Sequence, residues 1–320
     1  MGLDGGVLPD TDAGPQFTVL EIPGLPDPPP NFFDVWGTEN NDVYLVGERG
    51  TVVHWDGKSW SLQQTPTTAD LHGVWGFAKP DAGTELYAVG NGGVVVHGDN
   101  GVWTTEASTA TGDLHAVKGY GDNHGGRVLA VGVDGVIATK NLMMPGARWV
   151  KETSPSLETL AGLWVGGDGQ AVAVGALGTI LRRDTAGAWT RQRIDGFTLP
   201  LEGVWGTAPD QLWLVGLGGS VLKSNGMAFD EVMGAPSVFL RRVVGFDFGE
   251  VFITGWGGVI VRGSGTTATG YQNFSDHRLE GIWATHLDPT PIDPLNPDAG
   301  TWRPPRYYVV GVTGAVLIGP

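Results

Sequence analysis

A glycine pair recurs seven times along this chain of 320 residues, in the form Val-Gly-x-x-Gly or a close variant. A short run of β-branched or small residues follows each pair, as in the sequence VGERGTVV that begins at Val46. The first glycines of the pairs are Gly47, Gly90, Gly132, Gly175, Gly216, Gly255 and Gly311. The period is about 42 residues apart from a longer last interval, which is the length of one small structural unit repeated along the chain.

Each repeat predicts four short strands. A looser Val-Trp-Gly motif precedes each glycine pair, and an aromatic residue follows it. The aromatic residues are Trp60, Trp103, Trp149, Trp189, Phe229 and Tyr271. Short β-branched runs bounded by turn residues indicate strands, and the two residues between the glycines predict a hairpin turn in which glycine supplies a positive φ. Four strands at this period are typical of a β-propeller blade.

The N-terminal segment supplies a strand that the last repeat lacks. The seventh repeat ends at Pro320 before its fourth strand, whereas Phe17–Ile22 precedes the first repeat and resembles the fourth-strand sequence that begins at Trp60. Pairing the two ends would bury edges that otherwise favour aggregation. We therefore predict an all-β, seven-bladed β-propeller of four-stranded blades, which forms a single domain over residues 17–320 after a flexible acidic leader, residues 1–16.

Composition excludes several classes of function. A net charge of −15 and the lack of any long basic run argue against nucleic acid as a partner. Without cysteine there are no disulfides and no cysteine-based metal centres, and no apolar stretch is long enough to span a membrane. Because small acidic leaders often follow an export signal, we expect an extracytoplasmic monomer in the periplasm, on the cell surface or secreted, with a lipid anchor upstream left open.

The sequence Gly47–Trp60 resembles bacterial propellers of the photosystem II stability/assembly factor-like type and the Asp-box (BNR) repeats of sialidase-like propellers. It is most similar to the VWG-repeat propellers of bacterial secreted lipoproteins. Asp56 lies one residue too close to Trp60 for a full Asp-box. The resemblance covers nearly the whole chain and implies a seven-bladed propeller, but it implies no single activity, because propellers carry many functions.

Candidate binding residues are those that differ between repeats at one level of the ring. Two residues before the valine of each Val-Trp-Gly, where the inner strand begins, the repeats carry Phe33, His72, His115, Ala161, Glu202, Arg241 and Glu280. The turns add Glu48, Arg49, Asn91, Asp134 and Trp256. We predict a polar ligand-binding site made of His72, His115, Glu202, Arg241, Trp256, Glu280, Glu48, Arg49, Asn91 and Asp134. The alternative is that exposed ring positions simply become polar.

Metal binding is the weaker interpretation of these residues. His72 and His115 occupy equivalent positions in adjacent blades and could hold a divalent metal with Asp134, but two surface histidines more often form ordinary hydrogen bonds. The insertion Thr285–Pro305 carries Asp288, Asp293 and Asp298, whose oxygens could bind calcium, although a proline-stiffened loop explains them more simply. We therefore expect no cofactor, with calcium in the insertion as the alternative.

Nine of the 13 tryptophans fall in two repeated positions, and we expect them to pack between blades. A multivalent lectin with sugars stacked on these rings is the alternative. Trp256 breaks the repeat inside a turn, so we expect it to be exposed.

The sequence carries no GxSxG, P-loop or HExxH motif. The favoured function is a non-enzymatic binding or scaffold propeller that recognises a protein or a glycan on one face. The alternative is a sialidase-like hydrolase or lyase that acts on a polysaccharide through Glu202 and Glu280 near the central channel.

Overall fold

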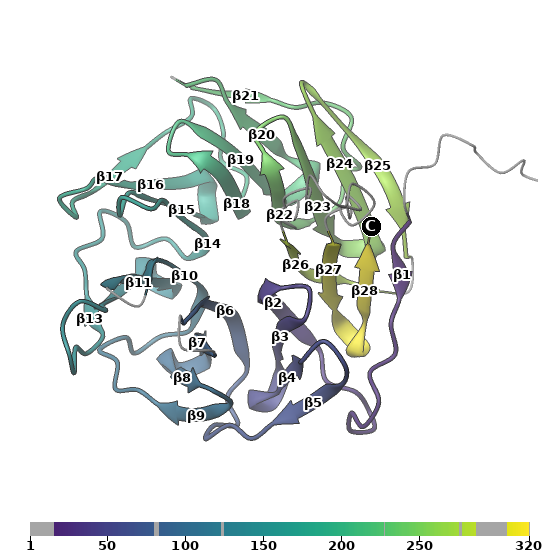
Figure 1. Ribbon diagram of the computed structural model, residues 1–320. Coiled ribbons are helices and arrows are strands. Elements are labelled where there is room, and N and C mark those ends of the chain that lie inside the picture. The colour runs from purple at the N-terminus through teal and green to yellow at the C-terminus, as the bar shows by residue number, and fades with distance from the viewer. Residues whose placement is uncertain are drawn as a thin grey trace, which may run out of the picture.

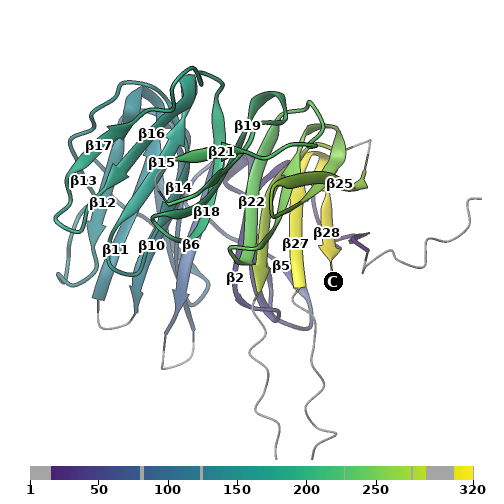
Figure 2. The same cartoon turned by 90° about the horizontal axis from the view of Figure 1, so that it is seen from above.

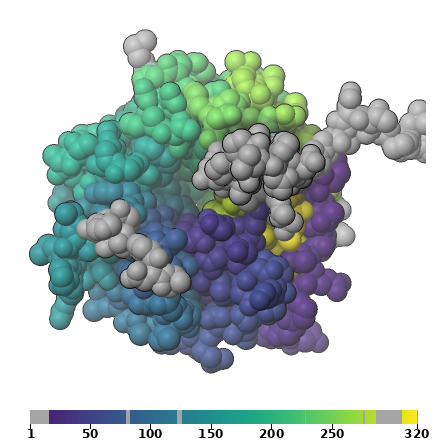
Figure 3. Space-filling model, viewed as in Figure 1, coloured from purple at the N-terminus to yellow at the C-terminus, as the bar shows by residue number. Residues whose placement is uncertain are grey.

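The computed structural model describes residues 16–79, 83–122, 125–226, 228–274, 277–285 and 306–319. These residues form seven four-stranded antiparallel sheets arranged in a ring (Figure 1). Seen from the side, the sheets stand next to one another as blades (Figure 2), and the space-filling view shows them packed around a small central hollow (Figure 3). The predicted all-β, seven-bladed propeller is therefore confirmed.

Each blade runs outward from an inner strand at the channel to an outer strand on the outside of the ring (Figure 1). The first three blades are β2 (Phe32–Glu39), β3 (Asp42–Gly47), β4 (Val52–Trp55) and β5 (Trp60–Gln63); β6 (Leu71–Ala78), β7 (Thr84–Gly90), β8 (Val95–Asp99) and β9 (Val102–Thr105); and β10 (Leu114–Asp122), β11 (Gly125–Gly132), β12 (Ile137–Asn141) and β13 (Val150–Lys151). The fourth is β14 (Leu160–Val165), β15 (Ala171–Gly175), β16 (Thr179–Arg183) and β17 (Trp189–Gln192).

The fifth blade is β18 (Leu201–Ala208), β19 (Gln211–Gly216), β20 (Val221–Ser224) and β21 (Phe229–Glu231), and the sixth is β22 (Leu240–Asp247), β23 (Glu250–Gly255), β24 (Val259–Ser264) and β25 (Thr267–Asn273). The seventh combines both ends of the chain: β26 (Leu279–Thr285), β27 (Arg306–Gly311), β28 (Val316–Gly319) and β1 (Thr18–Val19).

The N-terminal strand closes the ring, as predicted, although it is shorter than the expected Phe17–Ile22. β1 pairs with β28 through Thr18 and Val19, and the Leu20 amide extends the pairing by donating to the Val316 carbonyl at 2.7 Å. The Phe17 side chain is 2% exposed. It packs against the seventh blade in the position that an aromatic residue occupies in the outer strand of other blades.

The glycine pairs form seven 3₁₀ turns, named η1 to η6 and η8, between the second and third strands. The second glycine of each pair has a positive φ, as expected, but the first is extended, at −170° in Gly90. Close packing explains it: a Cβ at Gly90 would lie 1.8 Å from the carbonyl oxygen of Asp70, just before the inner strand. The next amide, of Asn91, donates to that same oxygen. The pair thus docks each turn onto the start of an inner strand.

The tryptophan of each Val-Trp-Gly packs against the glycine of the next blade, which confirms the expected packing role of this position. A Cβ at Gly119 would lie 2.6 Å from the Trp75 ring, and one at Gly37 would lie 2.9 Å from Trp283. The same contact joins Trp36 to Gly76 and Trp205 to Gly245, while the Trp164 indole donates to the Gly206 carbonyl at 2.7 Å.

Two blades lack this tryptophan, and the residue that follows in the next blade is then not glycine. Lys118 takes the place of the tryptophan in the third blade, and Val165 takes the place of the glycine in the fourth. In the same way, Val244 replaces the tryptophan in the sixth blade, and Ala284 replaces the glycine in the seventh. The glycine is therefore kept where an indole ring needs the space.

The second aromatic position needs one correction. In four blades, the aromatic residue pairs with one of the last two residues of the third strand: Trp60, Trp103, Trp189 and Phe229. In the sixth blade Ala268 takes that place opposite Gly263, so the assignment of Tyr271 was wrong. The fourth strand there is longer and places Tyr271 further along, beside Phe17.

Two predicted segments lie wholly or largely outside the described residues: the leader, up to residue 15, and the insertion that carries Asp288, Asp293 and Asp298. Within the described ranges, no helix is both long enough and apolar enough to cross a membrane.

Candidate functional site

A β-bulge at the start of every inner strand directs one side chain toward the end of the channel. In the second blade, Leu71 and Gly73 pair with consecutive residues of β7, so that His72 is the extra, bulged residue. The same shift occurs in the other six blades. Bulges re-aim side chains and are common beside functional sites. We call the resulting ring the channel mouth; it consists of Phe33, His72, His115, Ala161, Glu202, Arg241 and Glu280.

The channel mouth holds a small cavity of about 260 Å³. Four predicted site residues line it: His72, His115, Glu202 and Arg241. Phe33, Thr159, Ala161 and Arg242 complete the lining. The structure thus brings together the predicted inner-strand residues of six blades, and Glu280 of the seventh joins them through its contact with Arg241.

Arg241 connects the two glutamates of the channel mouth. Its Nη1 lies 2.5 Å from Glu202 Oε2, and its Nε lies 2.7 Å from Glu280 Oε2. Arg278 Nη2 approaches the second oxygen of Glu280 at 3.2 Å. Burial raises the pKa of Glu202 above its usual value, against the opposing effect of Arg241 and Arg242. Both carboxylates are therefore engaged in ion pairs rather than free in the cavity.

The two histidines are neighbours, but each already has a hydrogen-bond partner. His72 Nε2 lies 2.6 Å from Asn91 Oδ1, and His115 Nδ1 lies 3.2 Å from the Leu160 carbonyl oxygen. Their ring centroids are 5.9 Å apart, in an edge-to-face arrangement. Burial, and then the nearby His72, lowers the pKa of His115. In the described part of the chain, no three acidic or histidine side chains gather as a metal site would require.

The predicted turn residues Glu48 and Arg49 make structural contacts, Glu48 within its own blade and the Arg49 backbone with the next blade. Glu48 accepts hydrogen bonds from the backbone and side chain of Asn31. The Arg49 amide donates to Asp70 Oδ1 at 2.8 Å, across the boundary to the next blade. Asp134 occupies the left-handed position of η3, with φ of 53°. None of these three residues lines the cavity of the channel mouth.

Exposed apolar side chains occur on the same face of the propeller, in the turns and loops of blades four to six. Five large apolar side chains are exposed there, and we call them the apolar rim: Leu157 (84% exposed), Leu177 (57%), Leu199 (42%), Leu217 (41%) and Trp256 (40%). The exposure of Trp256 agrees with its prediction. Its ring meets Phe239 edge-on at 4.9 Å, and the Arg278 guanidinium lies 4.1 Å from the ring centroid. The rim is thus continuous with the charged residues of the channel mouth.

Asp34 and Arg242 are channel residues that sequence reasoning missed. Each directly follows the bulged residue of its inner strand, where the other blades carry Gly73, Ala116, Gly162, Gly203 and Gly281. Both line a second cavity of about 290 Å³ deeper in the channel, and Arg242 also lines the mouth. The detectable signal was two charged residues at a position that is otherwise glycine or alanine.

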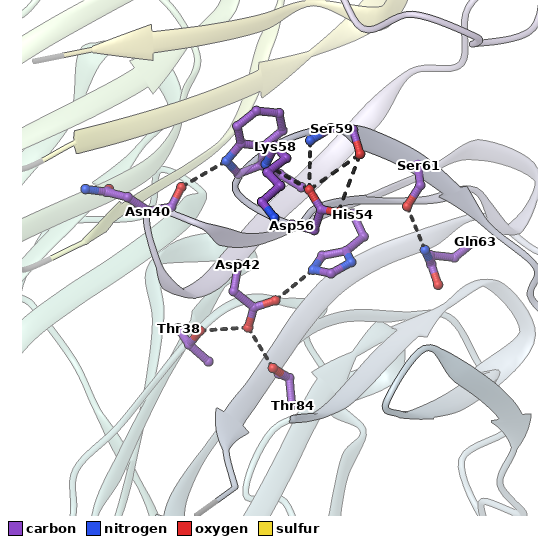
Figure 4. Close-up of polar contacts among 11 residues, drawn as sticks. Thr38, Asn40, Asp42, His54, Asp56, Lys58, Ser59, Ser61, Gln63 and Thr84 are labelled. Atoms are coloured by element: carbon purple, nitrogen blue, oxygen red, sulfur yellow. Dashed lines mark hydrogen bonds and ion pairs between the residues drawn. The ribbon is translucent and has the colours of Figure 1, made fainter. Parts of the chain in front are cut away.

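A polar cluster around Asp42 lies in a surface groove of about 570 Å³ between the first and second blades. Asp42 Oδ1 lies 2.7 Å from His54 Nε2, while Thr38 and Thr84 donate to Oδ2 at 2.7 and 2.6 Å (Figure 4). The His54 ring stacks on Tyr44, with centroids 4.1 Å apart. An aspartate–histidine pair of this kind resembles part of a catalytic site.

Other blades repeat the same arrangement, which argues for a structural role. In the second blade, Glu85 contacts both Tyr87 and His97, and the two rings stack. In the sixth blade, Glu250 and Arg262 form the corresponding ion pair. An acid, an aromatic residue and a base thus recur on the second and third strands, so the cluster at Asp42 belongs to the packing of the blade.

No protein-family model matches the chain, and no curated protein matches it in sequence. Solved structures do match. YCF48 bound to D1 peptide has a TM-score of 0.68 at 17% identity over 95% of this chain and 94% of that one. YCF48 from Cyanidioschyzon merolae has a TM-score of 0.69 at 16% identity over 95% and 98%. Virginiamycin B lyase from Staphylococcus aureus has a TM-score of 0.75 at 14% identity over 96% and 99%.

These identities are too low to transfer a function, but the coverage is nearly complete in both directions. One of the matching structures holds a peptide and another is a lyase, so similar scaffolds serve both binding and catalysis. The chain is a seven-bladed β-propeller that shares its whole fold with YCF48 and virginiamycin B lyase.

Proposed function

We propose that this propeller is a non-enzymatic binding module that holds an apolar segment of a partner protein across the apolar rim and the channel mouth. The observation that carries the proposal is the apolar rim itself. Single exposed apolar residues are ordinary on protein surfaces, whereas a group on neighbouring loops marks an interaction site. Here five such residues follow one another over three consecutive blades, beside a cavity with charged walls.

Leu177 supports this interpretation because its position costs stability without contributing burial. Its φ is 52°, a left-handed conformation that costs about 1–2 kcal/mol for residues other than glycine. The equivalent residue is glycine in three blades, and in the other three it is Arg49, Asp134 or Thr313. Strained residues of this kind are common at binding sites. An exposed leucine in this left-handed conformation is explained if a partner covers it.

The channel mouth adds polar specificity to the apolar surface. Arg278 is half exposed, with its guanidinium stacked on Trp256 and one nitrogen near Glu280. A partner that packs on Trp256 would therefore also meet a cation fixed in place, where a carboxylate or a backbone carbonyl of the partner could bind. The structure of YCF48 with a bound D1 peptide shows that a propeller of this fold can hold a peptide.

Catalysis on a polysaccharide is the second candidate, and the raised pKa of Glu202 is the observation in its favour. An acid with a raised pKa keeps its proton to a higher pH and can act as a general acid. Against it, Arg241 holds both Glu202 and Glu280 in ion pairs. We rank binding first. The extracytoplasmic location and the monomeric state remain predictions from the sequence, as does recognition of a glycan.

A peptide library displayed on phage tests the proposed function. The purified wild-type protein is expected to enrich peptides with large apolar side chains, and synthetic copies of them should bind with measurable affinity. The informative variant is Leu177→Asn, since asparagine tolerates a positive φ better than leucine does. We expect this variant to unfold at a higher temperature than wild type and yet to bind the peptides at least about tenfold more weakly, about 1.4 kcal/mol.

Val102→Asn is the matched control, because Val102 is 67% exposed on the outer strand of the second blade, away from the rim. It should leave peptide binding unchanged. The proposal fails if no peptide is enriched, or if enriched peptides bind Leu177→Asn as tightly as wild type. Hits on a glycan array that depend on Trp256 would instead favour a lectin, and cleavage of a polysaccharide that is lost in Glu202→Gln would favour the enzyme.

A further inference from the structure

The inner channel holds a second cavity, which adjoins the channel mouth at Arg242. All seven inner strands line it with residues that follow the bulge, and its volume is about 290 Å³. Five tryptophans contribute to its wall: Trp36, Trp75, Trp164, Trp205 and Trp283. Trp36 is 9% exposed, and the other four are partly exposed, although each packs against a neighbouring blade. The channel therefore has an aromatic wall that the packing of the blades does not fully cover.

Two cations reach this aromatic space. Lys118 replaces the tryptophan of the third blade, and Arg242 replaces the small residue of the sixth. Lys118 Nζ lies 3.9 Å from Asp34 Oδ2, an oxygen that also accepts the Val74 amide at 3.0 Å. Asp34 is the only carboxylate that lines this space within the described residues, so the cations outnumber it.

Arg242 carries the charge that lacks a direct partner. Its Nη1 donates to the carbonyl oxygens of Glu202 and Arg241, at 3.3 and 3.2 Å. Within the described residues, these are the hydrogen bonds of its guanidinium, and no carboxylate oxygen lies within 4.0 Å of it. Burial, and then repulsion from Arg241, lowers the pKa of Arg242. A guanidinium away from bulk water is stabilised when an anion binds it.

From this arrangement we infer that the inner channel binds a small aromatic carboxylate, with its carboxylate on Arg242 and Lys118 and its ring against the tryptophans. A carboxylate matches the planar fork of arginine, and indole faces favour flat apolar groups. The volume admits a molecule of about one ring rather than a polymer chain. This site lies beyond the mouth along the inner strands and does not depend on the proposed binding of a partner protein.

Titration of the protein with phenylacetate tests the inference, with intrinsic tryptophan fluorescence and calorimetry as readouts. We expect saturable binding at millimolar concentration or tighter, with a fluorescence change because the ring contacts indoles. Phenylacetamide has the same shape without the charge and should bind at least about tenfold more weakly, about 1.4 kcal/mol. Acetate carries the charge without the ring and should leave the fluorescence unchanged.

Variants locate the site. Lys118→Met should weaken the binding of phenylacetate several-fold, and Arg242→Gln should abolish it. Because Lys118 lines the inner channel and not the mouth, its effect separates the two cavities even if the arginine variant folds poorly. Arg262→Met is the matched control, since Arg262 is an exposed cation on the third strand of the sixth blade. Equal binding of phenylacetate and phenylacetamide, an unchanged affinity in Lys118→Met, or no saturable binding at all would each overturn the inference.

Discussion

The pairing of tryptophan with glycine across blade boundaries predicts how a new pair should behave. The junction between blades six and seven carries Val244 and Ala284, which line the same channel wall and pack around one hydrophobic cluster. Val244→Trp alone should destabilise the protein, because the new ring would meet the Cβ of Ala284. Adding Ala284→Gly should recreate the contact seen at the other junctions and recover stability.

The magnitude follows from the natural pairs. A Cβ would lie 2.6 Å from the Trp75 ring at Gly119 and 2.9 Å from Trp205 at Gly245, whereas carbon atoms prefer about 3.5–4.0 Å. Overlap of this size costs about 1–3 kcal/mol. Ala284→Gly alone should cost about 0.5–1 kcal/mol through backbone entropy. The double variant should therefore be more stable than the sum of the two changes predicts, by at least about 1 kcal/mol.

Urea unfolding of the wild type, both single variants and the double variant gives this coupling energy directly. As a control, Val244→Trp combined with Ala188→Gly, at an exposed turn in the fourth blade, should give additive effects. Additivity within about 0.5 kcal/mol for the pair at positions 244 and 284 would refute the reasoning. In that case, the glycines that follow the tryptophans would be needed for the conformation of their own strands and not to make room for the indole ring of the preceding blade.

Three further predictions concern closure, the turns and pH. Phe17→Ala should lower stability by about 3–5 kcal/mol, measured by urea unfolding, because the ring is 2% exposed where the two chain ends meet; a loss below about 1 kcal/mol would mean that closure depends little on this side chain. In turn η6 (Trp256–Gly258), the adjacent residues Gly257 and Gly258 both have a positive φ. A Cβ added at Gly257 would meet nothing within 4 Å, whereas one added at Gly258, the second glycine of the pair, would lie 1.7 Å from the Phe274 carbonyl oxygen. Gly258→Ala should therefore lower the melting temperature much more than Gly257→Ala, and equal effects would contradict the docking role of the second glycine. Burial raises the pKa of Asp42, but hydrogen bonds from its neighbours outweigh this effect and leave the pKa lowered. The stability that Asp42 provides should therefore be complete above about pH 4 and lost as pH falls through the folded pKa. Asp42→Asn should flatten the acid side of a curve of unfolding free energy against pH.

The fold was predictable because its cause repeats in the sequence. Each glycine pair performs the same docking in every blade, so seven weak signals combine into one strong one. The match between Phe17 and Trp60 identified the closing strand from residues far apart in the chain. The extended conformation of the first glycine was not predicted, because what constrains it is a carbonyl oxygen just before the inner strand, about 20 residues earlier for Gly90, and sequence spacing does not show such a contact.

The candidate site was less predictable, since it depends on where the repeats differ. The inner-strand positions identified His72, His115, Glu202 and Arg241, and the structure gathers them in one cavity. The apolar rim was missed apart from Trp256, because an exposed leucine in a turn looks in sequence like any other leucine. Arg242 was missed because it follows another arginine, and only the bulge lets the second arginine line the inner channel as well as the mouth.

The tryptophan–glycine contacts run in one direction, from each blade to the next in chain order. The tryptophan of each blade therefore packs on the glycine of the following blade. The glycine of each blade is in turn covered by the tryptophan of the preceding blade. A duplicated blade of the common type fits on either side, which makes growth of the propeller by copying straightforward. Blades three and four, and six and seven, are exceptions, because each of these pairs has changed both partners of the contact. Recombination should preserve them as two-blade units, and a chimaera cut between them should be the least stable of the series.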